Sequence, residues 1–532
     1  MPSITIDNQH IEVPLGTTIL DAAHRLGIEI PTLCHLAGLP PQTSCFVCVV
    51  KVNGAARLLP SCATVATEGM VVESETAEVR AARRTALELL LGDHLGDCIG
   101  PCQGVCPAYM DIPGMIRLVE DGRLREAVVL VKERIPFPAV LGRICTAFCE
   151  RGCRRAQHDA TVSIALLERL VGDADLASHE PYNPPCKPAS GKRAAIIGAG
   201  PAGLSAAYYL LREGHACTLF DTREQPGGAW REIGEDRLPQ AVLDGEIGRI
   251  LALGAEFRPG MRASLDDLRK EYDAILIAAG EAGGAFPGVA MSEQGIRADR
   301  QTLQTNLPGV FAAGSAVAPS HHAVRAVADG RITAYSIIQF LAGQPVTGGE
   351  RRPFSTHMGR LHPDELGLLL EQVSADGQIV PAGAGFTPEE AREECARCLH
   401  CDCRKLHACR LRDFSIMYDA DTGKYRGVRR PFTRDASHPQ VIYEPGKCID
   451  CGICIRIAES RREELGLSFI GRGFDVRPAV PFDHSLAEGL REAAEECADA
   501  CPTGALSGTD HSQGTEGLLK KSSQSVPGTL VE

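Results

Sequence analysis

The spacing of hydrophobic residues changes several times along the chain. Residues 3–13 hold two short runs in which hydrophobic and polar residues alternate, which predicts a β-hairpin. Residues 18–26 have the spacing of an amphipathic helix, and Gly27 is well suited to end it. Residues 77–92 predict a longer helix, and residues 192–213 indicate a strand, a glycine-rich turn and another helix. The pattern therefore predicts a multidomain protein of mixed α/β and α+β classes.

The chain has 532 residues, a length that corresponds to roughly three or four domains. Its hydrophobic share of 44% and charged share of 23% are ordinary for a soluble protein. Hydrophobic runs such as residues 274–279 are far shorter than the roughly 20 residues that span a bilayer, and the N-terminal MPSITIDNQH lacks the features of a signal peptide. A net charge of −13 disfavours nucleic acid as a partner, because phosphate binding needs a basic surface. We expect a cytoplasmic protein with no membrane span.

Cysteine is the most informative residue type in this sequence. The chain has 22 cysteines, and all except Cys186 and Cys217 fall into local groups. Disulfide frameworks belong to small secreted proteins, whereas this chain is long and has no export signal. Grouped cysteines in a reducing compartment indicate metal ligands, and their spacing indicates which metal.

The first group of cysteines lies within residues 1–80. Its four members follow a C-x10-C-x2-C-x13-C pattern on a loop beside a small predicted sheet. Four thiolates on such a loop suit a [2Fe–2S] cluster, whose iron needs soft anionic sulfur, and a zinc site is the alternative. The stretch resembles the β-grasp ferredoxin domain at the front of the large peripheral iron–sulfur subunit of respiratory complex I and of iron-only hydrogenases. The predicted ligands are Cys34, Cys45, Cys48 and Cys62.

Residues 81–185 contain two further triplets of cysteines, each with C-x3-C-x3-C spacing. Six cysteines are too few for two clusters with four cysteine ligands each, so two other ligands are needed. The sequence around them, including residues 111–117 and 136–138, resembles the N-terminal α-helical iron–sulfur domain of the glutamate synthase small subunit and of dihydropyrimidine dehydrogenase. That family holds two [4Fe–4S] clusters, with cysteines crossing between the triplets. The resemblance implies one cluster on Cys98, Cys102 and Cys153 and another on Cys106, Cys145 and Cys149.

Two residues outside the triplets would complete these ligand sets. The family's second cluster uses a Gln or Glu from the following helix, and Glu168 occupies that position. For the first cluster the family has another cysteine upstream, which this sequence lacks, and His94 lies there instead. His94 and Cys98 form a His-x3-Cys arrangement that resembles the His/Cys3 cluster of complex I. The alternatives are a surface histidine at position 94 and a helix salt-bridge residue at position 168.

Residues 186–345 follow a proline-rich linker and have the pattern of a Rossmann-like domain. A strand leads into a GxGxxG turn and a helix, and a second strand ends in Asp221. Glycines allow the tight turn and the close approach of a pyrophosphate, the helix N-terminus favours its charge, and Asp221 can accept a hydrogen bond from a ribose. The alternative is a Rossmann unit without a cofactor. The predicted contacts are Gly198, Gly200, Pro201, Ala202, Gly203 and Asp221.

Further motifs in this domain resemble the FAD domain of the same glutamate synthase small-subunit family, and the resemblance runs through residues 98–340. The family inserts a second Rossmann domain, for NAD(P)H, where this chain has only residues 281–300, which is too short for one. Ser315 stands where the family usually has an Asp that bonds the ribityl chain. His321 and His322 begin a predicted helix whose N-terminus should face the flavin. The resemblance implies FAD contacts at Gly227, Gly228, Arg237, Leu238, Ala279, Gly280, Gly314 and Ser315.

The C-terminal part of the chain has a different character. Residues 346–390 are rich in glycine and proline and indicate a linker, with a helix start at Thr387. Residues 391–506 form a cysteine-rich domain that resembles a bacterial ferredoxin, in which three close cysteines and one remote Cys-Pro hold a [4Fe–4S] cluster. Residues 507–532 are rich in serine, glycine and threonine, which predicts a disordered tail. The ferredoxin-like ligands are Cys448, Cys451, Cys454 and Cys501, with Cys497 as a spare.

A second cysteine group in the same domain has no common ferredoxin spacing. It suits either another [4Fe–4S] cluster or a structural zinc ion. Its predicted ligands are Cys398, Cys401, Cys403 and Cys409. The cofactors expected for the whole chain are therefore FAD, one [2Fe–2S] cluster and three or four [4Fe–4S] clusters.

This combination of centres predicts electron transfer. A flavin exchanges electrons in pairs or singly, whereas each cluster carries one. The sequence holds no nucleophile elbow, HExxH or P-loop motif, and no catalytic residue is predicted. We expect an electron-transfer subunit of an anaerobic oxidoreductase complex. Its catalytic partner would resemble a formate dehydrogenase or a hydrogenase, with a ferredoxin or an NAD(P)H-oxidising subunit as a further partner.

Two other functions stay open at this point. The first is a stand-alone NAD(P)H:acceptor oxidoreductase, in which nicotinamide binds directly at the flavin face. The second is a redox-sensing or scaffold iron–sulfur protein. So many clusters on one chain suit conduction better than sensing, for which a single cluster would suffice.

Overall fold

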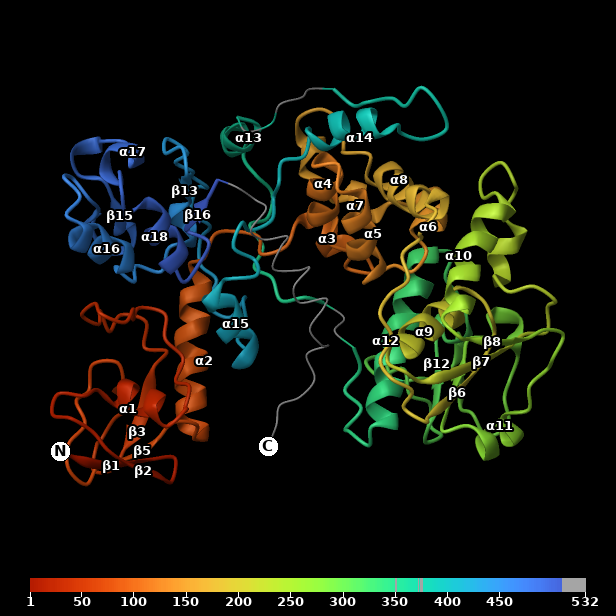
Figure 1. The fold of residues 1–532 in the computed structure, drawn as a ribbon, viewed down its shortest axis with the longest axis horizontal. Helices are drawn as coiled ribbons and strands as arrows, with labels where there is room; N and C mark the ends of the chain where they lie inside the picture. The colour runs from red at the N-terminus through yellow and green to blue at the C-terminus, as the bar shows by residue number, and fades with distance from the viewer. Residues whose placement is uncertain (350–351, 372, 374–376, 510–532) are drawn as a thin grey trace. The chain divides into compact units, whose positions relative to one another are not determined.

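The computed structural model describes residues 1–349, 352–371, 373 and 377–509 (Figure 1). The chain folds into two compact units that interleave along the sequence. It leaves the first unit after Ile99, builds the second, and then returns to the first twice. The first unit comprises Met1–Ile99, Phe354–Glu371 and the chain from Asp402 onward, and the second comprises Gly100–Pro353 and Gln372–Cys401.

A five-stranded sheet and a short helix form the N-terminal part of the first unit (Figure 1). The elements are β1 (Ser3–Ile6), β2 (Gln9–Glu12), α1 (Ile19–Arg25), β3 (Val49–Val52), β4 (Leu59–Pro60) and β5 (Val71–Glu73). The strand order is β2-β1-β5-β3-β4, and only β1 and β5 are parallel neighbours. At the start of α1, the side chain of Thr18 accepts a hydrogen bond from the backbone nitrogen of Asp21, 3.1 Å away. The hairpin and the helix thus lie where the sequence predicts them.

The C-terminal part of the first unit combines short helices with two small antiparallel sheets. The long helix α2 (Ala77–Gly92) precedes it and has the predicted bounds. The other elements are α13 (Pro363–Leu370), α15 (Arg410–Met417), β13 (Val441–Tyr443), α16 (Ile453–Arg461), β14 (Ser468–Ile470), β15 (Arg477–Ala479), α17 (Leu486–Gly489), α18 (Ala494–Ala500) and β16 (Leu506–Gly508). β13 pairs with β16, and β14 pairs with β15. Residues from both ends of the unit share one hydrophobic core, which includes Leu33, Leu87, Ile453 and Leu490.

Parts of the expected linker and of the expected disordered tail have regular structure. Within residues 346–390, Leu366 and Leu369 of α13 are buried, and α14 (Pro388–Cys395) begins with the expected cap at Thr387. The first residues of the expected disordered tail, 507–532, belong to strand β16, because they complete a pair with β13. Residues 350–351, 372, 374–376 and 510–532 lie outside the described part of the chain.

Short helices form one half of the second unit. They are α3 (Pro101–Val105), α4 (Ile112–Glu120), α5 (Leu124–Lys132), α6 (Pro138–Ile144), α7 (Phe148–Arg151) and α8 (Ile164–Ala177). α6 and α8 touch along their backbones, because each presents a glycine to the other. A Cβ at Gly142 would lie 2.4 Å from the backbone nitrogen of Arg169, and one at Gly172 would lie 2.1 Å from that of Ala139. α14 packs against α4 in the same unit.

A parallel sheet with helices forms the other half of the second unit (Figure 1). Its elements are β6 (Arg193–Ile197), α9 (Pro201–Arg212), β7 (Ala216–Phe220), α10 (Gln240–Ala252), β8 (Glu256–Arg258), α11 (Leu265–Glu271), β9 (Ala274–Ile277), β12 (Val310–Ala312) and α12 (Ala323–Leu341). The strand order is β12-β9-β6-β7-β8, and all neighbours are parallel. Between β9 and β12 the chain forms only short elements, of which β10 (Met291–Ser292) and β11 (Gly295–Ile296) are paired strands. Residues 281–300 therefore do not form a second nucleotide-binding domain.

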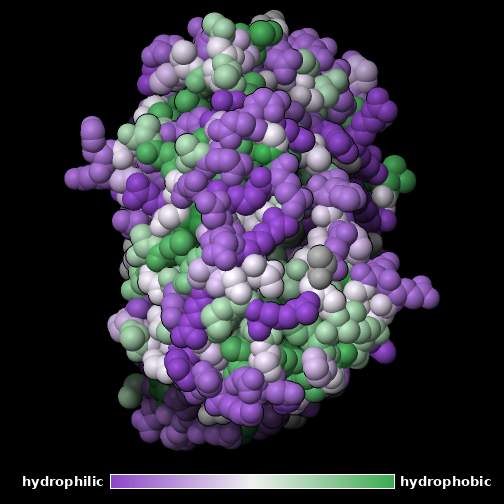
Figure 2. Space-filling view, turned by 90° about the vertical axis from the view of Figure 1, so that its right-hand side faces the viewer, coloured by the Kyte–Doolittle hydropathy of each residue, from purple (hydrophilic) through white to green (hydrophobic). Residues whose placement is uncertain are grey.

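No helix in the described residues combines the length and the hydrophobicity needed to cross a membrane. Hydrophilic side chains cover much of the face shown in Figure 2, and hydrophobic residues lie among them in small groups.

Candidate cofactor sites

The four N-terminal cysteines gather beside the sheet of the first unit. All four are buried, and the sulfur atoms of Cys48 and Cys62 lie 3.4 Å apart. Cys48 directly precedes β3, and Cys62 follows β4, so strand pairing brings the two together. Contact with Cys45 lowers the pKa of Cys34, and contact with Cys62 lowers that of Cys48. Each pair thus holds one thiol that ionises easily, as ligation of iron requires.

Cys98 lies with Cys403 and Cys409 in the first unit. The backbone nitrogen of Cys403 donates a hydrogen bond to the carbonyl oxygen of Cys98, 3.1 Å away. Burial raises the pKa of Cys409, and the nearby Cys403 and Cys98 raise it further. The grouping differs from the one implied by the resemblance, which joined Cys98 to Cys102 and Cys153. The physical reason is that the chain passes from the first unit to the second between Ile99 and Gly100.

His94 precedes Cys98 and has the properties of a fourth ligand for this group. Its Nδ1 atom is buried and has no hydrogen-bond partner among the described residues. Burial, and then the charge of Lys447, lower the pKa of His94 to about 4. The ring is therefore neutral near pH 7, which is the state in which imidazole binds a metal.

Cys102 and Cys153 lie with Cys398 and Cys401 in the second unit. Burial raises the pKa of Cys102, and the next largest contributions come from Cys398, Cys153 and Cys401 in turn. Spacing along the sequence predicted one group of Cys398 and Cys401 with Cys403 and Cys409, but the two units divide that group at Asp402. Cys398 and Cys401 thus lie with two cysteines of the helical half, although they come from a segment far downstream.

A buried network of charges fastens this downstream segment to the helical half of the second unit. Arg397, the neighbour of Cys398, lies 2.7 Å from Oε1 of Glu394 and 3.2 Å from Oδ1 of Asp159. Asp159 also accepts a hydrogen bond of 2.6 Å from Nε of Arg155. Because Arg155 follows Cys153 closely in sequence, the network links the segment of Cys153 to the segment of Cys398.

Cys106, Cys145 and Cys149 lie near Glu168, as the resemblance implies. The side chain of Glu168 is buried, and its Oε1 atom has no hydrogen-bond partner among the described residues. Burial and the charge of Glu246 raise the pKa of Glu168 to about 8. Burial raises the pKa of Cys145, and the carboxylate of Glu168 makes the next largest contribution. A buried carboxyl oxygen without a partner is costly unless something else binds it, so Glu168 is well placed to be a ligand.

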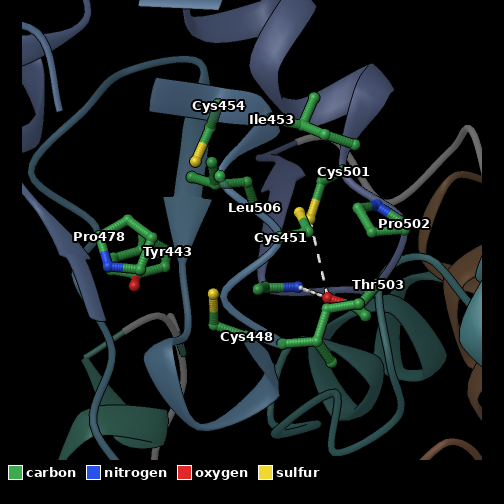
Figure 3. Close-up of a pocket in the computed structure, with 13 residues that line it drawn as sticks. Tyr443, Cys448, Cys451, Ile453, Cys454, Pro478, Cys501, Pro502, Thr503 and Leu506 are labelled. Atoms are coloured by element: carbon green, nitrogen blue, oxygen red, sulfur yellow. Dashed lines mark hydrogen bonds between the residues drawn. The ribbon is translucent and has the colours of Figure 1, made fainter. Parts of the chain in front are cut away.

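The ferredoxin-like cysteines line a small hydrophobic cavity in the first unit (Figure 3). The sulfur atoms of Cys448, Cys451, Cys454 and Cys501 face this space, together with Tyr443, Pro478 and Leu506. The hydroxyl of Thr503 lies 3.7 Å from the sulfur of Cys501. Cys497 is buried elsewhere, with its sulfur 3.5 Å from the carbonyl oxygen of Cys454.

No three His, Cys, Asp or Glu side chains in the described ranges are placed to hold a single metal ion.

The glycine-rich turn connects β6 to α9, as predicted. A Cβ at Gly203 would lie 2.0 Å from the carbonyl oxygen of Gly198, so only glycine permits this tight turn. A Cβ at Gly200 would meet only the Cα of Gly228, at 3.9 Å, so the space above the turn is open to a ligand. Asp221 directly follows β7, and its Oδ2 atom accepts a hydrogen bond of 2.7 Å from the backbone nitrogen of Ala199. The geometry suits a pyrophosphate at the N-terminus of α9.

A cavity of about 310 Å³ lies next to three of the predicted flavin contacts, Ala279, Gly280 and Ser315. Residues of the short segment 281–300, including Phe286 and Met291, form the other side of the cavity. Its size lies at the lower end of the range for small-molecule sites, roughly 300–1,000 Å³.

The start of α12 touches the loop that carries Cys145 and Cys149. The Nδ1 atom of His322 lies 3.3 Å from the hydroxyl oxygen of Thr146. The ring of His322 packs edge-on against that of Phe148, with the ring centroids 4.8 Å apart. The sequence places His322 at the start of a helix whose N-terminus should face the flavin, where it could tune the flavin's potential or simply begin the helix. Its contact with a cysteine loop was not predicted, because nothing in the local sequence signals it.

Three family models match separate parts of the chain. Residues 2–77 match the 2Fe-2S iron-sulfur cluster binding domain. Residues 95–180 match the dihydropyrimidine dehydrogenase domain II, 4Fe-4S cluster, and residues 196–256 match the NAD(P)-binding Rossmann-like domain. The chain thus combines two iron–sulfur domains with a nucleotide-binding fold.

Curated relatives match parts of the chain. The NADP(+)-dependent formate dehydrogenase subunit beta of Moorella thermoacetica is 38% identical over 215 residues, which cover 36% of this chain and 30% of that protein. The NADPH-Fe(3+) oxidoreductase subunit beta of Geobacter sulfurreducens is 34% identical over 200 residues, or 36% of this chain and 30% of that protein. The NAD-dependent dihydropyrimidine dehydrogenase subunit PreT of Salmonella typhimurium is 36% identical over 195 residues, or 35% of this chain and 46% of that protein. In each case the alignment spans less than half of the relative.

Proposed function

We propose that this chain is an iron–sulfur flavoprotein that transfers electrons within an oxidoreductase complex. The matched domains and the names of the relatives, which are subunits of oxidoreductases, support this proposal. The partner would be a catalytic subunit of the formate dehydrogenase or hydrogenase type, since this chain supplies carriers. A ferredoxin or an NAD(P)H-oxidising subunit would be the second partner.

The cysteine groups support five clusters. The N-terminal group would hold a [2Fe–2S] cluster, and each of the other four groups provides the four ligands of a [4Fe–4S] cluster. In the second unit, the non-cysteine ligand Glu168 completes one of these groups. In the first unit, His94 completes another. The four [4Fe–4S] ligand sets are His94, Cys98, Cys403 and Cys409; Cys102, Cys153, Cys398 and Cys401; Cys106, Cys145, Cys149 and Glu168; and Cys448, Cys451, Cys454 and Cys501.

The Rossmann-like domain would hold FAD. Its glycine turn and Asp221 fit the pyrophosphate and the ribose, and Gly227 and Gly228 lie above the turn, where a Cβ at Gly228 would meet Gly200 at 2.9 Å. Bound FAD would supply the conversion between two-electron and one-electron transfer. Ser315, beside the cavity, would donate or accept a hydrogen bond where the family has a carboxylate.

One observation supports this function more than any other. His322, at the start of the helix that faces the flavin site, contacts Thr146 and Phe148 in the ligand loop of the Glu168 group. In this proposal the three side chains would lie between the flavin and the cluster of the Glu168 group. Direct electron exchange between two carriers requires such a short separation, which an unrelated pair of sites would not provide.

The cluster sites of the first unit are also next to one another. Cys34 is close enough to Cys451 to raise its pKa, after burial and Cys501. In the same way, Cys501 is one of the neighbours that raise the pKa of Cys409. Three ligand sets thus follow one another through a single hydrophobic core, an arrangement that supports relay of electrons.

An anaerobic titration would test the proposal. The reconstituted chain is mixed with NADH, NADPH or dithionite, and the absorbance of the flavin and of the clusters is followed. We expect no bleaching with either nucleotide and full bleaching with dithionite, as for a relay that waits for a partner protein. A chain that binds no iron or no flavin would contradict the proposal.

A stand-alone NAD(P)H:acceptor oxidoreductase is the second candidate. The cavity of about 310 Å³ beside Gly280 and Ser315 favours it, because a nicotinamide ring could reach the flavin there without a domain of its own. Bleaching of the flavin by stoichiometric NADH or NADPH in the same titration would support this function in place of the first.

A further inference from the structure

Lys447 is a buried cation between two of the ligand sets in the first unit. Its side chain is only 6% exposed, and its Nζ atom lies 4.0 Å from the sulfur of Cys403. The next residue along the chain is Cys448 of the ferredoxin-like set. The ammonium group donates to one carboxylate oxygen of Glu444, and Nη2 of Arg434 lies 3.0 Å from the other. Two positive charges and one negative charge are therefore buried at this point.

The fold leaves space for this side chain by means of two glycines. A Cβ at Gly96 would lie 2.7 Å from Cε of Lys447. A Cβ at Gly504 would lie 2.5 Å from the sulfur of Cys403 and 3.6 Å from Cδ of Lys447. The hydroxyl of Thr503 donates to the carbonyl oxygen of Lys447 at 2.9 Å and thereby holds the backbone. The lysine is consequently held beside Cys403 and cannot swing into solvent.

The charge of Lys447 is buried beside the charges of Arg434 and Glu444, and its burial calls for an explanation. Arg434 and Glu444 already form a neutral pair, with Nε and Nη2 of the arginine at 3.3 and 3.0 Å from one carboxylate oxygen. Lys447 adds an unbalanced positive charge, which is costly to bury. A thiolate-bound cluster carries negative charge and gains one more unit on reduction, so a fixed cation nearby stabilises its reduced state.

We infer that Lys447 is a positioning residue that raises the reduction potential of the cluster held by His94, Cys98, Cys403 and Cys409. The inference rests on the proposed function, since it assumes a cluster at this site. The redox step is exchange of one electron with the neighbouring site on the ferredoxin-like cysteines, in which one site loses the electron that the other gains. The positive charge of Lys447 stabilises the reduced state of the cluster beside Cys403. The negative charge of Glu444 weakens this stabilisation.

A redox titration of the full chain, followed by electron paramagnetic resonance, tests the inference. The variant Cys409→Ala first identifies which signal belongs to this site. In Lys447→Met we expect the ratio of reduced to oxidised centre at fixed potential to fall at least tenfold, which for a one-electron centre is a shift of at least about 59 mV to lower potential. In Glu444→Gln, which keeps the shape and one acceptor oxygen but removes the negative charge, we expect a shift in the opposite direction.

The control is Lys51→Met, which removes an exposed lysine of the same unit, 3.3 Å from Glu78, and should shift no signal. Equal potentials in wild type, Lys447→Met and Glu444→Gln, or shifts in the same direction for both variants, would overturn the inference. If Lys447→Met fails to fold, the double variant decides, because its potential should be lower than that of Glu444→Gln alone. Retention of every signal and of all iron in Cys409→Ala would instead contradict the proposed cluster itself.

Discussion

The backbone nitrogen of Cys403 donates a hydrogen bond to the carbonyl oxygen of Cys98, although the whole second unit lies between them in the sequence. This contact brings together cysteines from two segments that lie far apart in the sequence. It also means that the cysteine triplet beginning at Cys98 and the cysteine group ending at Cys409 are each divided between two units. The chain thus builds its sites by interleaving, and each unit is complete only after the chain returns to it.

Replacement of Cys403 by alanine should remove one cluster and leave the flavin in place. The expected change is the loss of four iron atoms per chain and of the one resonance signal that the Cys98→Ala variant also loses. Iron analysis and low-temperature resonance spectra of both variants would check this. The control is Cys395→Ala, a buried cysteine in the same sequence group that belongs to none of the ligand sets. Loss of different signals in the two variants would contradict the grouping.

Replacement of Arg397 by methionine should destabilise the second unit by about 3–5 kcal/mol, because it leaves the buried Glu394 without its charged partner. The single tryptophan, Trp230, is buried in that unit, so urea unfolding followed by its fluorescence reports on the unit's stability.

The matched control for this prediction is Arg258→Met. Arg258 pairs with Glu256 at 2.9 Å on the surface, and exposed pairs of this kind contribute about 0–1 kcal/mol. Equal unfolding midpoints for the two variants would show that the buried network does not hold the segment that carries Cys398 and Cys401.

Local patterns in the sequence were enough to predict the elements that depend on neighbouring residues. The hairpin of β1 and β2, the bounds of α2 and the strand–turn–helix around Gly200 follow from periodicity and from the steric freedom of glycine. The side chains of Cys448, Cys451, Cys454 and Cys501 line one cavity, and the first three come from one short segment that runs into α16. In all these cases the determining contacts lie within one short segment or repeat a known spacing.

The pairing of distant cysteines could not be predicted in the same way. Cys401 and Cys403 are separated only by Asp402, yet they belong to different units. The spacing of these two cysteines along the chain cannot reveal this. Two cysteines separated by one residue can bind at the same site or at two different sites. The one available signal was a deficit: the six cysteines in the helical domain left two ligands to be supplied from elsewhere in the sequence.

Replacement of Glu168 should distinguish a ligand from an ordinary helix residue. In Glu168→Gln we expect the cluster to remain, since an amide oxygen can still bind, with a higher reduction potential because one negative charge is lost. In Glu168→Leu we expect the cluster of Cys106, Cys145 and Cys149 to be lost. Redox titration of the first variant and iron content of the second are the measurements. Full iron content in Glu168→Leu would mean that the carboxylate is not a ligand.

Replacement of Gly200 by alanine should weaken flavin binding without unfolding the domain. The new Cβ would meet only the Cα of Gly228, at 3.9 Å, so the protein itself has room for it. It would, however, stand where a pyrophosphate approaches the turn, and we expect at least a tenfold loss of affinity, or about 1.4 kcal/mol. Flavin content after dialysis and the fluorescence of Trp230 would separate binding from stability.

The control is Gly248→Ala in α10. The new Cβ would have no neighbour within 4 Å, so this variant should stabilise the helix by about 1 kcal/mol and leave flavin binding unchanged. Wild-type flavin affinity in a folded Gly200→Ala variant would place the pyrophosphate elsewhere.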